Sequence, residues 1–283
     1  MNYKSYKTLI AVANKLTKHY AKKFISTALV PIDYTRTKEI PAILDISGID
    51  IKKNKKLRIL DIGSPQILSL SLCFCSELWD VVYINPFKKE LEDLHLKSSV
   101  LCLKNLDVRY GDITNLLTIS NIGQFDYIFS CSVFEHINPE KGGDIIASKN
   151  VTHLLKPGGI FSFSVPYYKK SFNEYKYGDV YYIKSLTNEK TFFQRFYDDE
   201  SLNRQIIEPT GLTVLQKKYI GERYYYKNNI NKRMALLVGT GKRALLLGRF
   251  FRIISDFFME ESSNFKLLKK PYLAIFSLKK NLC

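Results

Sequence analysis

The stretch that most restricts the possible fold runs from Phe125 to Pro166, FDYIFSCSVFEHINPEKGGDIIASKNVTHLLKPGGIFSFSVP. It opens with an apolar, β-prone run typical of a buried strand, and polar residues including Glu135 and His136 follow directly. Apolar residues then recur near helical spacing up to Lys-Pro-Gly-Gly at 156–159, where proline and glycine end a helix. A second apolar strand leads into Pro166. The block therefore predicts strand, polar loop, helix and strand, which is half of a doubly wound α/β unit.

Apolar strands and helical patterns alternate along most of the remaining chain. Further strands are predicted at residues 57–62, 81–84, 106–110, 212–220 and 272–278. Helices are predicted at residues 67–78, 88–96 and 198–208, with a short helix or irregular connector at 115–122. Strands that alternate with helices form parallel sheets with right-handed crossovers. We therefore expect an α/β fold with a doubly wound, mostly parallel seven-stranded sheet.

The segments around this core have different patterns. Residues 3–29 read as an amphipathic helix, so we expect an N-terminal helical extension over 1–56 and the α/β domain over 57–283. Residues 167–200 are rich in tyrosine, phenylalanine and lysine, and they are predicted to be a lid or acceptor loop. Their interleaved aromatic and basic residues also fit a surface that stacks nucleic-acid bases. Residues 228–262 are predicted to be a basic helical insertion before the last strand.

The formal net charge of +16 is unevenly distributed. Residues 1–60 carry +9, residues 61–215 carry −4 and residues 216–283 carry +11. Basic flanks fit two interpretations, namely solvated lysines or attraction to an anionic surface or substrate. The basic stretch at 230–258 likewise fits either a helix lying on anionic lipid or an insertion that packs on the core.

Cysteine, histidine and hydropathy patterns indicate the compartment and exclude some site types. The five cysteines form no CxxC pair, which is typical of free thiols in a reducing cytosol. The four histidines have no metal-ligand spacing, so no metal site is expected. No run reaches the roughly 18–20 apolar residues of a membrane span, and the lysine-rich N-terminus is a poor signal peptide. We expect a cytoplasmic protein, with peripheral contact at an anionic membrane as an open alternative.

The strand, acidic-histidine loop, helix, LLKPGG and strand, in that order, resemble the class I S-adenosylmethionine-dependent methyltransferases. The resemblance covers roughly Leu57 to Ile220 and the last strand. It implies a Rossmann-like fold, S-adenosylmethionine as cofactor and methyl transfer as the reaction. Two positions depart from the family pattern: Pro65 stands where further glycines are usual, and Asn85 stands where an acidic residue is usual.

The resemblance also implies roles for particular residues. Those implied to bind the cofactor are Asp61, Gly63, Ser64, Asn85, Asp112, Ile113, Ser130, Cys131 and Glu135. Those implied to contact the acceptor are Tyr167 and Tyr168. His136 is the candidate catalytic base, because an unperturbed histidine has a pKa near 6.5. The equally weighted alternative is that His136 only packs or bonds to the backbone.

Several function classes remain open at this point. The first is methyl transfer to oxygen or nitrogen of a small-molecule or membrane-linked metabolite. The second is a nucleic-acid methyltransferase, suggested by the basic flanks without a recognition motif. The third is a non-catalytic binding protein with the same fold, suggested by Pro65 and Asn85. A nicotinamide dehydrogenase ranks last because the chain lacks a GxGxxG sequence.

Overall fold

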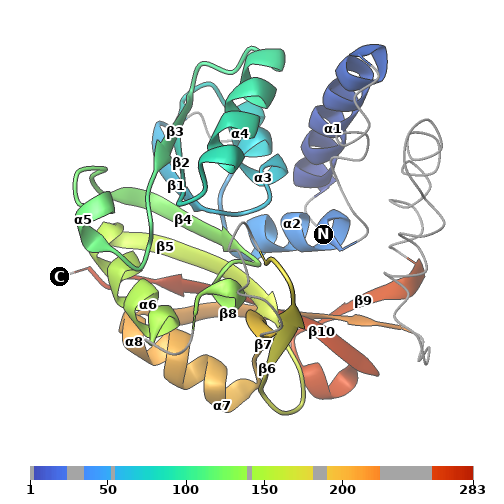
Figure 1. Cartoon of the computed structure of the whole chain (residues 1–283), viewed down its shortest axis with the longest axis vertical. Coiled ribbons are helices and arrows are strands. Elements are labelled where there is room, and N and C mark those ends of the chain that lie inside the picture. Colours follow the sequence, from blue (N-terminus) through green and yellow to red (C-terminus); the bar gives the residue numbers. More distant parts are fainter. Residues whose placement is uncertain are drawn as a thin grey trace.

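The computed structural model describes residues 3–23, 35–51, 55–138, 142–180, 190–223 and 257–282. Their strands form an eight-stranded sheet and a separate two-stranded hairpin, and helices cover the larger sheet (Figure 1). The larger sheet contains β1 (Leu57–Ile62), β2 (Trp79–Asn85), β3 (Leu106–Tyr110), β4 (Phe125–Cys131), β5 (Leu155–Pro166), β8 (Thr213–Glu222), β9 (Met259–Ser262) and β10 (Lys270–Lys279). The hairpin contains β6 (Phe172–Tyr177) and β7 (Lys190–Phe196). The helices are α1 (Tyr3–Lys23), α2 (Arg36–Ile46), α3 (Ile67–Cys75), α4 (Lys88–Val100), α5 (Leu116–Ile119), α6 (Gly143–Leu154), α7 (Asp199–Leu202) and α8 (Glu208–Thr210).

The strand order places a ligand edge at the centre of the larger sheet. The order is β3-β2-β1-β4-β5-β10-β8-β9. The strands from β3 to β5 pair in parallel, as the alternation of strands and helices predicts. β10 is antiparallel to β5 and to β8, and β9 is antiparallel to β8. Because the order reverses between β1 and β4, ligands are expected outside the carboxyl ends of these two strands.

The sheet is covered on both faces because its central strands are apolar on both sides. On β1, Ile59 belongs to one buried apolar cluster and Leu60 belongs to the other. Residues of α1, α2, α3 and α4 complete the first cluster. Residues of α5, α6 and the helical stretch 199–210 complete the second. This burial on both sides explains why the parallel strands read as continuous apolar runs.

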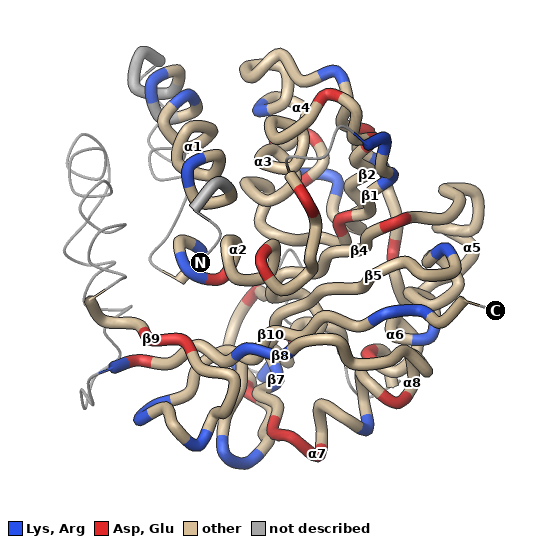
Figure 2. The backbone as a smooth tube through the Cα atoms, turned by 180° about the vertical axis from the view of Figure 1, so that it is seen from behind, with Lys and Arg blue, Asp and Glu red and all other residues tan. Residues whose placement is uncertain are grey.

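The N-terminal helix α1 is attached through a single apolar stripe. Leu9, Val12, Ala13 and Leu16 recur at three- and four-residue spacing, and each is at most 1% exposed. Figure 2 shows basic residues along α1, all of them lysines, and no acidic residue on it. Of the described helices, α1 included, none is long and apolar enough to cross a bilayer. The predicted helix over 3–29 is present from Tyr3 to Lys23, and residues 24–34 lie outside the described ranges.

At the edge of the sheet, the structure differs from two expectations based on the sequence. The larger sheet has eight strands instead of seven because β9 pairs with the end of β8. β9 occupies the last four residues of the predicted helical insertion at 228–262. Its Met-Glu-Glu-Ser sequence has no apolar alternation, so pairing with β8 rather than local preference makes it a strand. Residues 224–256, which hold most of the predicted insertion, lie outside the described residues.

The segment expected only as a lid or acceptor loop contains the β6–β7 hairpin. The two strands pair from Phe172 with Phe196 to Tyr177 with Lys190. A register shift between Glu174 and Tyr175 interrupts the ladder, so the residue alternation along the two strands is irregular. That irregularity explains why no strand was expected here. Residues 181–189, between the two strands, are outside the described part of the chain.

Candidate active site

Loops from three strands meet at the carboxyl edge of the sheet. Gly63, directly after β1, has φ +60° and donates its N–H to the carbonyl of Ile84 over 2.9 Å. A Cβ at Gly63 would lie 3.5 Å from Cγ1 of Val133, after β4, and 3.6 Å from Nδ2 of Asn85, at the end of β2. The left-handed backbone explains why this position is glycine, and the two neighbours lie at ordinary contact distance. The structure therefore brings Gly63 and Asn85 together with the loop after β4.

Asp61 and Ser64 hold the loop after β1 from the inside. Asp61 Oδ1 accepts from the Ser64 N–H over 3.2 Å, and its Oδ2 accepts from the Ser69 hydroxyl. Burial raises the pKa of Asp61 to about 6, although its hydrogen bonds act in the opposite direction. The Ser64 hydroxyl accepts from the N–H of Cys131 over 2.9 Å, which joins this loop to the end of β4. Both side chains are almost fully buried and are used in these internal contacts.

Asn85 and Asp112 follow the next two strands, and both make local hydrogen bonds. Asn85 Nδ2 donates to the Tyr83 hydroxyl over 3.0 Å, and its Oδ1 accepts from the Phe87 N–H over 2.8 Å. Asp112 Oδ1 accepts from the N–H and the hydroxyl of Thr114, over 2.9 and 2.7 Å. The Asn85 side chain is thus fixed by contacts of the chain itself. The half-buried Asp112 carboxylate uses only Oδ1 in the contacts described.

Ile113, Ser130 and Cys131 are buried at the same edge. The Ile113 carbonyl accepts from Nδ2 of Asn150, on α6, over 2.8 Å. The Ser130 hydroxyl is buried and has no hydrogen-bond partner within the described residues. Burial raises the pKa of the Cys131 thiol well above its ordinary value. Cys131 is therefore a small core residue and no activated nucleophile.

An ion pair from α2 lies on the ends of β4 and β5. Arg36 pairs with the fully buried Glu39, and Arg36 Nη1 also donates to the Ser132 hydroxyl over 2.7 Å. Glu39 Oε1 accepts from the hydroxyls of Ser132 and Ser164, each over 2.6 Å. Neither Arg36 nor Glu39 was expected at the site. The one signal available was a carboxylate inside the apolar stretch of a helix, three residues after an arginine.

Glu135 is a buried carboxyl group next to this pair. It lies in the single 3₁₀ turn Phe134–His136 and is 2% exposed. Burial raises its pKa to about 8, with Arg36 acting to lower it and Glu39 to raise it. Its Oε2 has no hydrogen-bond partner among the residues the structure describes. A buried polar atom without a partner is uncommon in proteins and is typical of a binding or catalytic site.

His136 is bound to the hairpin through its ring. Nδ1 lies 2.8 Å from the carbonyl oxygen of Phe193, in β7. A carbonyl only accepts, so Nδ1 carries the hydrogen and the lone pair of the neutral ring is on Nε2. Nε2 lies 3.8 Å from Oε1 of Glu135. Burial lowers the pKa of His136 to about 4, so the ring is neutral at pH 7.

A second buried ion pair holds the hairpin to the sheet. Arg195 of β7 pairs with Asp144, in the first turn of α6, and also donates to the side chain of Gln205. The Tyr197 hydroxyl lies 3.3 Å from the same Asp144 carboxylate. Arg195 is 8% exposed and Asp144 is 2% exposed. The hairpin is thus fixed beside His136 by side chains from three separate segments.

The two tyrosines expected at the acceptor side lie in different environments. Tyr167 is 2% exposed, and the centroid of its ring lies 5.1 Å from that of Tyr219 and 5.3 Å from that of Phe265. Tyr168 is 48% exposed, and its ring packs edge-on against Phe172 of the hairpin, with the ring centroids 5.8 Å apart. Tyr167 therefore belongs to the core under β8, and only Tyr168 presents its ring to the surface.

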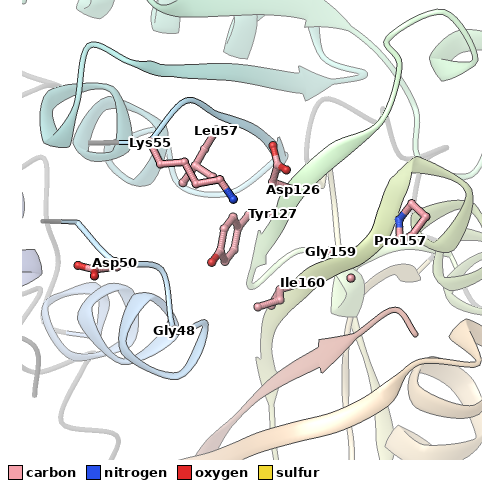
Figure 3. Close-up of a pocket in the computed structure, with 10 residues that line it drawn as sticks. Gly48, Asp50, Lys55, Leu57, Asp126, Tyr127, Pro157, Gly159 and Ile160 are labelled. Carbon is pink, nitrogen blue, oxygen red and sulfur yellow. The ribbon is translucent and has the colours of Figure 1, made fainter. Parts of the chain in front are cut away.

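A cavity of about 300 Å³ lies at the opposite, amino-terminal edge of the strands. Figure 3 shows Lys55 and Tyr127 projecting into it, between Asp50 on one side and Ile160 on the other. The residues expected at the active site do not line this cavity. It also lies away from the carboxyl edge, where ligands bind in sheets of this type. Across the described ranges, no three His, Cys, Asp or Glu side chains gather in a way that could hold a metal ion.

Comparison with protein-family models and with curated proteins found no match. Solved structures with the same arrangement do exist. Coclaurine N-methyltransferase, bound to N-methylheliamine and S-adenosylhomocysteine, is 15% identical over 97% of this chain and 88% of its own, with a TM-score of 0.55. An S-adenosylmethionine-dependent methyltransferase from Clostridium acetobutylicum is 16% identical over 95% and 98% of the two chains, with a TM-score of 0.52.

A third solved structure has the same arrangement under a different enzyme name. The [4+2]-cyclase SpnF is 13% identical over 86% of this chain and 80% of its own, with a TM-score of 0.52. At these identities the likeness concerns the fold, and the reaction has to be argued from the site. The strand order, the antiparallel β10 and the likeness to methyltransferase structures agree with one another. The chain therefore has the Rossmann-like fold of the class I S-adenosylmethionine-dependent methyltransferases.

Proposed function

We propose that the protein is an S-adenosylmethionine-dependent methyltransferase that acts on oxygen or nitrogen of a small-molecule or membrane-linked metabolite. The observation that carries the proposal is the meeting of Gly63, Asn85 and the loop after β4 at the point where the strand order reverses. This is the edge at which sheets of this type bind nucleotide-like ligands. The likeness to two methyltransferase structures supports the same conclusion.

The residues at this edge fit the cofactor. Gly63 has left-handed backbone that no side chain covers, and it lies next to Val133 and Asn85. Asp112 is the proposed acceptor for the adenine amino group, because its Oδ2 makes none of the contacts described for this carboxylate. Asp61 and Ser64 are proposed to act by shaping the loop, since their polar atoms are used inside the protein. Ser130 and Glu135 each keep a buried polar atom without a partner in the described part of the chain.

The proposed chemistry needs little beyond alignment and one proton acceptor. S-adenosylmethionine, when bound, supplies a methyl group made electrophilic by the sulfonium. The chain has to orient the acceptor and exclude water, and the hairpin beside His136 is suited to both tasks. His136 is the proposed base: Nε2 takes the proton of the acceptor hydroxyl or ammonium. The low pKa of about 4 keeps this nitrogen unprotonated at neutral pH and makes it a weak base.

Isothermal titration calorimetry with S-adenosylmethionine and S-adenosylhomocysteine tests the proposal. Asp112→Asn keeps an oxygen for Thr114 and replaces the other by an NH₂ group, so binding of both ligands should weaken about tenfold or more. His136→Asn keeps a donor for the Phe193 carbonyl, so its affinities should stay within about twofold of the wild type. Absence of binding by the wild type at millimolar ligand would disprove the proposal.

A non-catalytic binding role is the second candidate. It is favoured by Asn85, whose amide is used within the chain where the family usually has a carboxylate for the ribose. A protein that binds the cofactor but transfers no methyl group to any acceptor in a cell extract would support this role. Steep salt dependence of RNA binding would instead favour a nucleic-acid acceptor.

A further inference from the structure

The end of β4 is held in an unusual backbone conformation. Ser132 has φ +53°, a left-handed value that is unfavourable for a residue with a Cβ. The Ser132 N–H donates to the carbonyl and the hydroxyl of Ser164, over 3.0 and 3.1 Å. Strained backbone of this kind persists only where its surroundings fix it, and it is concentrated at functional sites.

Glu39 fixes this conformation from a distant part of the sequence. It accepts from the hydroxyls of both Ser132 and Ser164, so one carboxylate clamps the ends of β4 and β5. Arg36 completes the contact by bonding to Glu39 and to Ser132. Arg36, Ser132 and Ser164 all donate to Glu39, which is the arrangement that a buried carboxylate requires. Removing the carboxylate would leave two hydroxyls and one guanidinium short of an acceptor.

The clamped residue begins the segment that carries the proposed base. The 3₁₀ turn with Glu135 and His136 starts two residues after Ser132. Arg36 acts on the protonation of both Glu135 and His136, so its guanidinium lies within electrostatic range of the two side chains. The position of His136 is therefore fixed from two sides, by the hairpin at Phe193 and by α2 through Ser132.

We propose that Glu39 and Arg36 are positioning residues of the active site, which hold the loop after β4 and orient His136 from the N-terminal helix α2. The inference rests on the proposed function, because it takes His136 as the base. In this proposal, the segment before the α/β core helps to shape the active site. Neither residue has to touch the acceptor or the cofactor for this role.

The test follows the imidazole of His136 by ¹H–¹³C NMR in full-length protein labelled at histidine. The chain has four histidines, so His136→Asn assigns the signal. In Ser132→Ala and Glu39→Gln the His136 titration midpoint should rise by about one pH unit, because a looser loop admits water to the ring. Glu39→Asp keeps the carboxylate and should restore part of the wild-type midpoint.

Asp45→Asn is the matched control. Asp45 lies on the same helix and pairs with Lys218 over 3.2 Å, but its side chain is 36% exposed. This variant should leave the His136 midpoint unchanged. If Ser132→Ala and Glu39→Gln lower the free energy of unfolding while the His136 midpoint stays at its wild-type value, the pair is only structural and the proposal is wrong. Ser132→Ala removes a single hydroxyl, so it serves as the decisive variant if Glu39→Gln does not fold.

Calorimetry with S-adenosylhomocysteine separates this proposal from the proposed function. If the wild type binds the ligand and the variants keep a wild-type His136 midpoint, the positioning role fails and the proposed function stands. If the wild type does not bind, the proposed function fails, whatever the midpoints are. A shifted midpoint in Ser132→Ala with ligand affinity within about threefold of the wild type is the result expected for a positioning residue.

Discussion

Burial changes the chemistry of single residues at this site in opposite directions. It raises the pKa of Glu135 to about 8 and lowers that of His136 to about 4, because each group is favoured in its neutral form when water is removed. The two side chains lie 3.8 Å apart and follow one another in the sequence. At pH 7 both groups are therefore mostly neutral, and Glu135 lacks the negative charge that an ordinary glutamate carries.

The low pKa of His136 makes stability depend on pH. Unfolded protein binds a proton at His136 near pH 6.5, while the native state resists protonation down to about pH 4. Stability from this group is therefore complete above pH 6.5 and is lost as the pH falls from 6.5 to about 4. The loss amounts to at most about 3 kcal/mol. Urea unfolding at pH 7, 6, 5 and 4.5 should show a smaller decrease for His136→Asn than for the wild type.

The variant comparison isolates this residue from the other titrating groups. Asp61 has a raised pKa of about 6, so its contribution changes in the opposite sense and is shared by both proteins. Parallel pH curves for the wild type and His136→Asn would contradict the burial of a neutral imidazole.

The helix α4 ends with a recognisable C-terminal capping motif. After its C-cap residue Leu101, the Cys102 N–H donates to the Ser99 carbonyl and the Leu103 N–H donates to the Ser98 carbonyl, each over 3.1 Å. This pair of bonds is the Schellman motif, whose left-handed residue is most often glycine. Cys102 occupies that position with φ +56°, and its side chain is exposed. Within the described part of the chain, no side-chain contact of the kind seen at Ser132 holds Cys102 in this conformation.

Cys102→Gly should therefore stabilise the protein. Removing the Cβ from a left-handed residue is expected to raise the free energy of unfolding by about 1 kcal/mol. Urea unfolding, with an unchanged dependence on urea concentration, measures the effect. Cys102→Ala keeps the Cβ and should stay within about 0.5 kcal/mol of the wild type. Equal stabilities of the glycine and alanine variants would show that the backbone at Cys102 is not strained.

At the scale of the whole molecule, the N-terminal segment is packed on the sheet through α1 and α2. α1 contributes Leu9 and three further apolar residues to the buried cluster that also contains α3 and β1. α2 contacts β5, β8 and β10 and supplies the Arg36–Glu39 pair. The separation into an extension over 1–56 and a domain over 57–283 remains a prediction about sequence organisation. The packing argues that both parts unfold together.

Leu9→Ala tests this cooperativity. Removing a fully buried leucine side chain should cost about 3 kcal/mol and shift a single unfolding transition. Leu117→Ala is the matched control, because Leu117 is 88% exposed and its truncation should change stability by less than about 0.5 kcal/mol. Circular dichroism during urea unfolding measures the stability of both variants and the number of transitions. If Leu9→Ala leaves the main transition unchanged and adds an earlier one, α1 unfolds independently of the sheet.

The parallel half of the sheet and the residues at its carboxyl ends can be predicted from the amino-acid sequence. Strand and helix periods are local properties, and the turn residues at Gly63 and at 156–159 follow from backbone sterics. In a parallel sheet the carboxyl ends of successive strands lie at one edge, and this can be predicted without knowing the side-chain contacts. Gly63, Asn85 and His136 could therefore be expected near this edge from their order along the chain, and their roles there remain predictions.

Which polar atoms at this edge already have hydrogen-bond partners, and which do not, depends on contacts in the folded protein that the sequence does not reveal. Ser64 and Asn85 are engaged within the chain, Tyr167 is in the core, and Glu39 reaches the site from about ninety residues earlier in the sequence. β9 became a strand through its pairing with β8 and not through its composition. These outcomes depend on burial and on contacts between segments that are distant in the sequence. The free energy of such contacts depends on how much water is removed from the groups involved, and local sequence does not specify this.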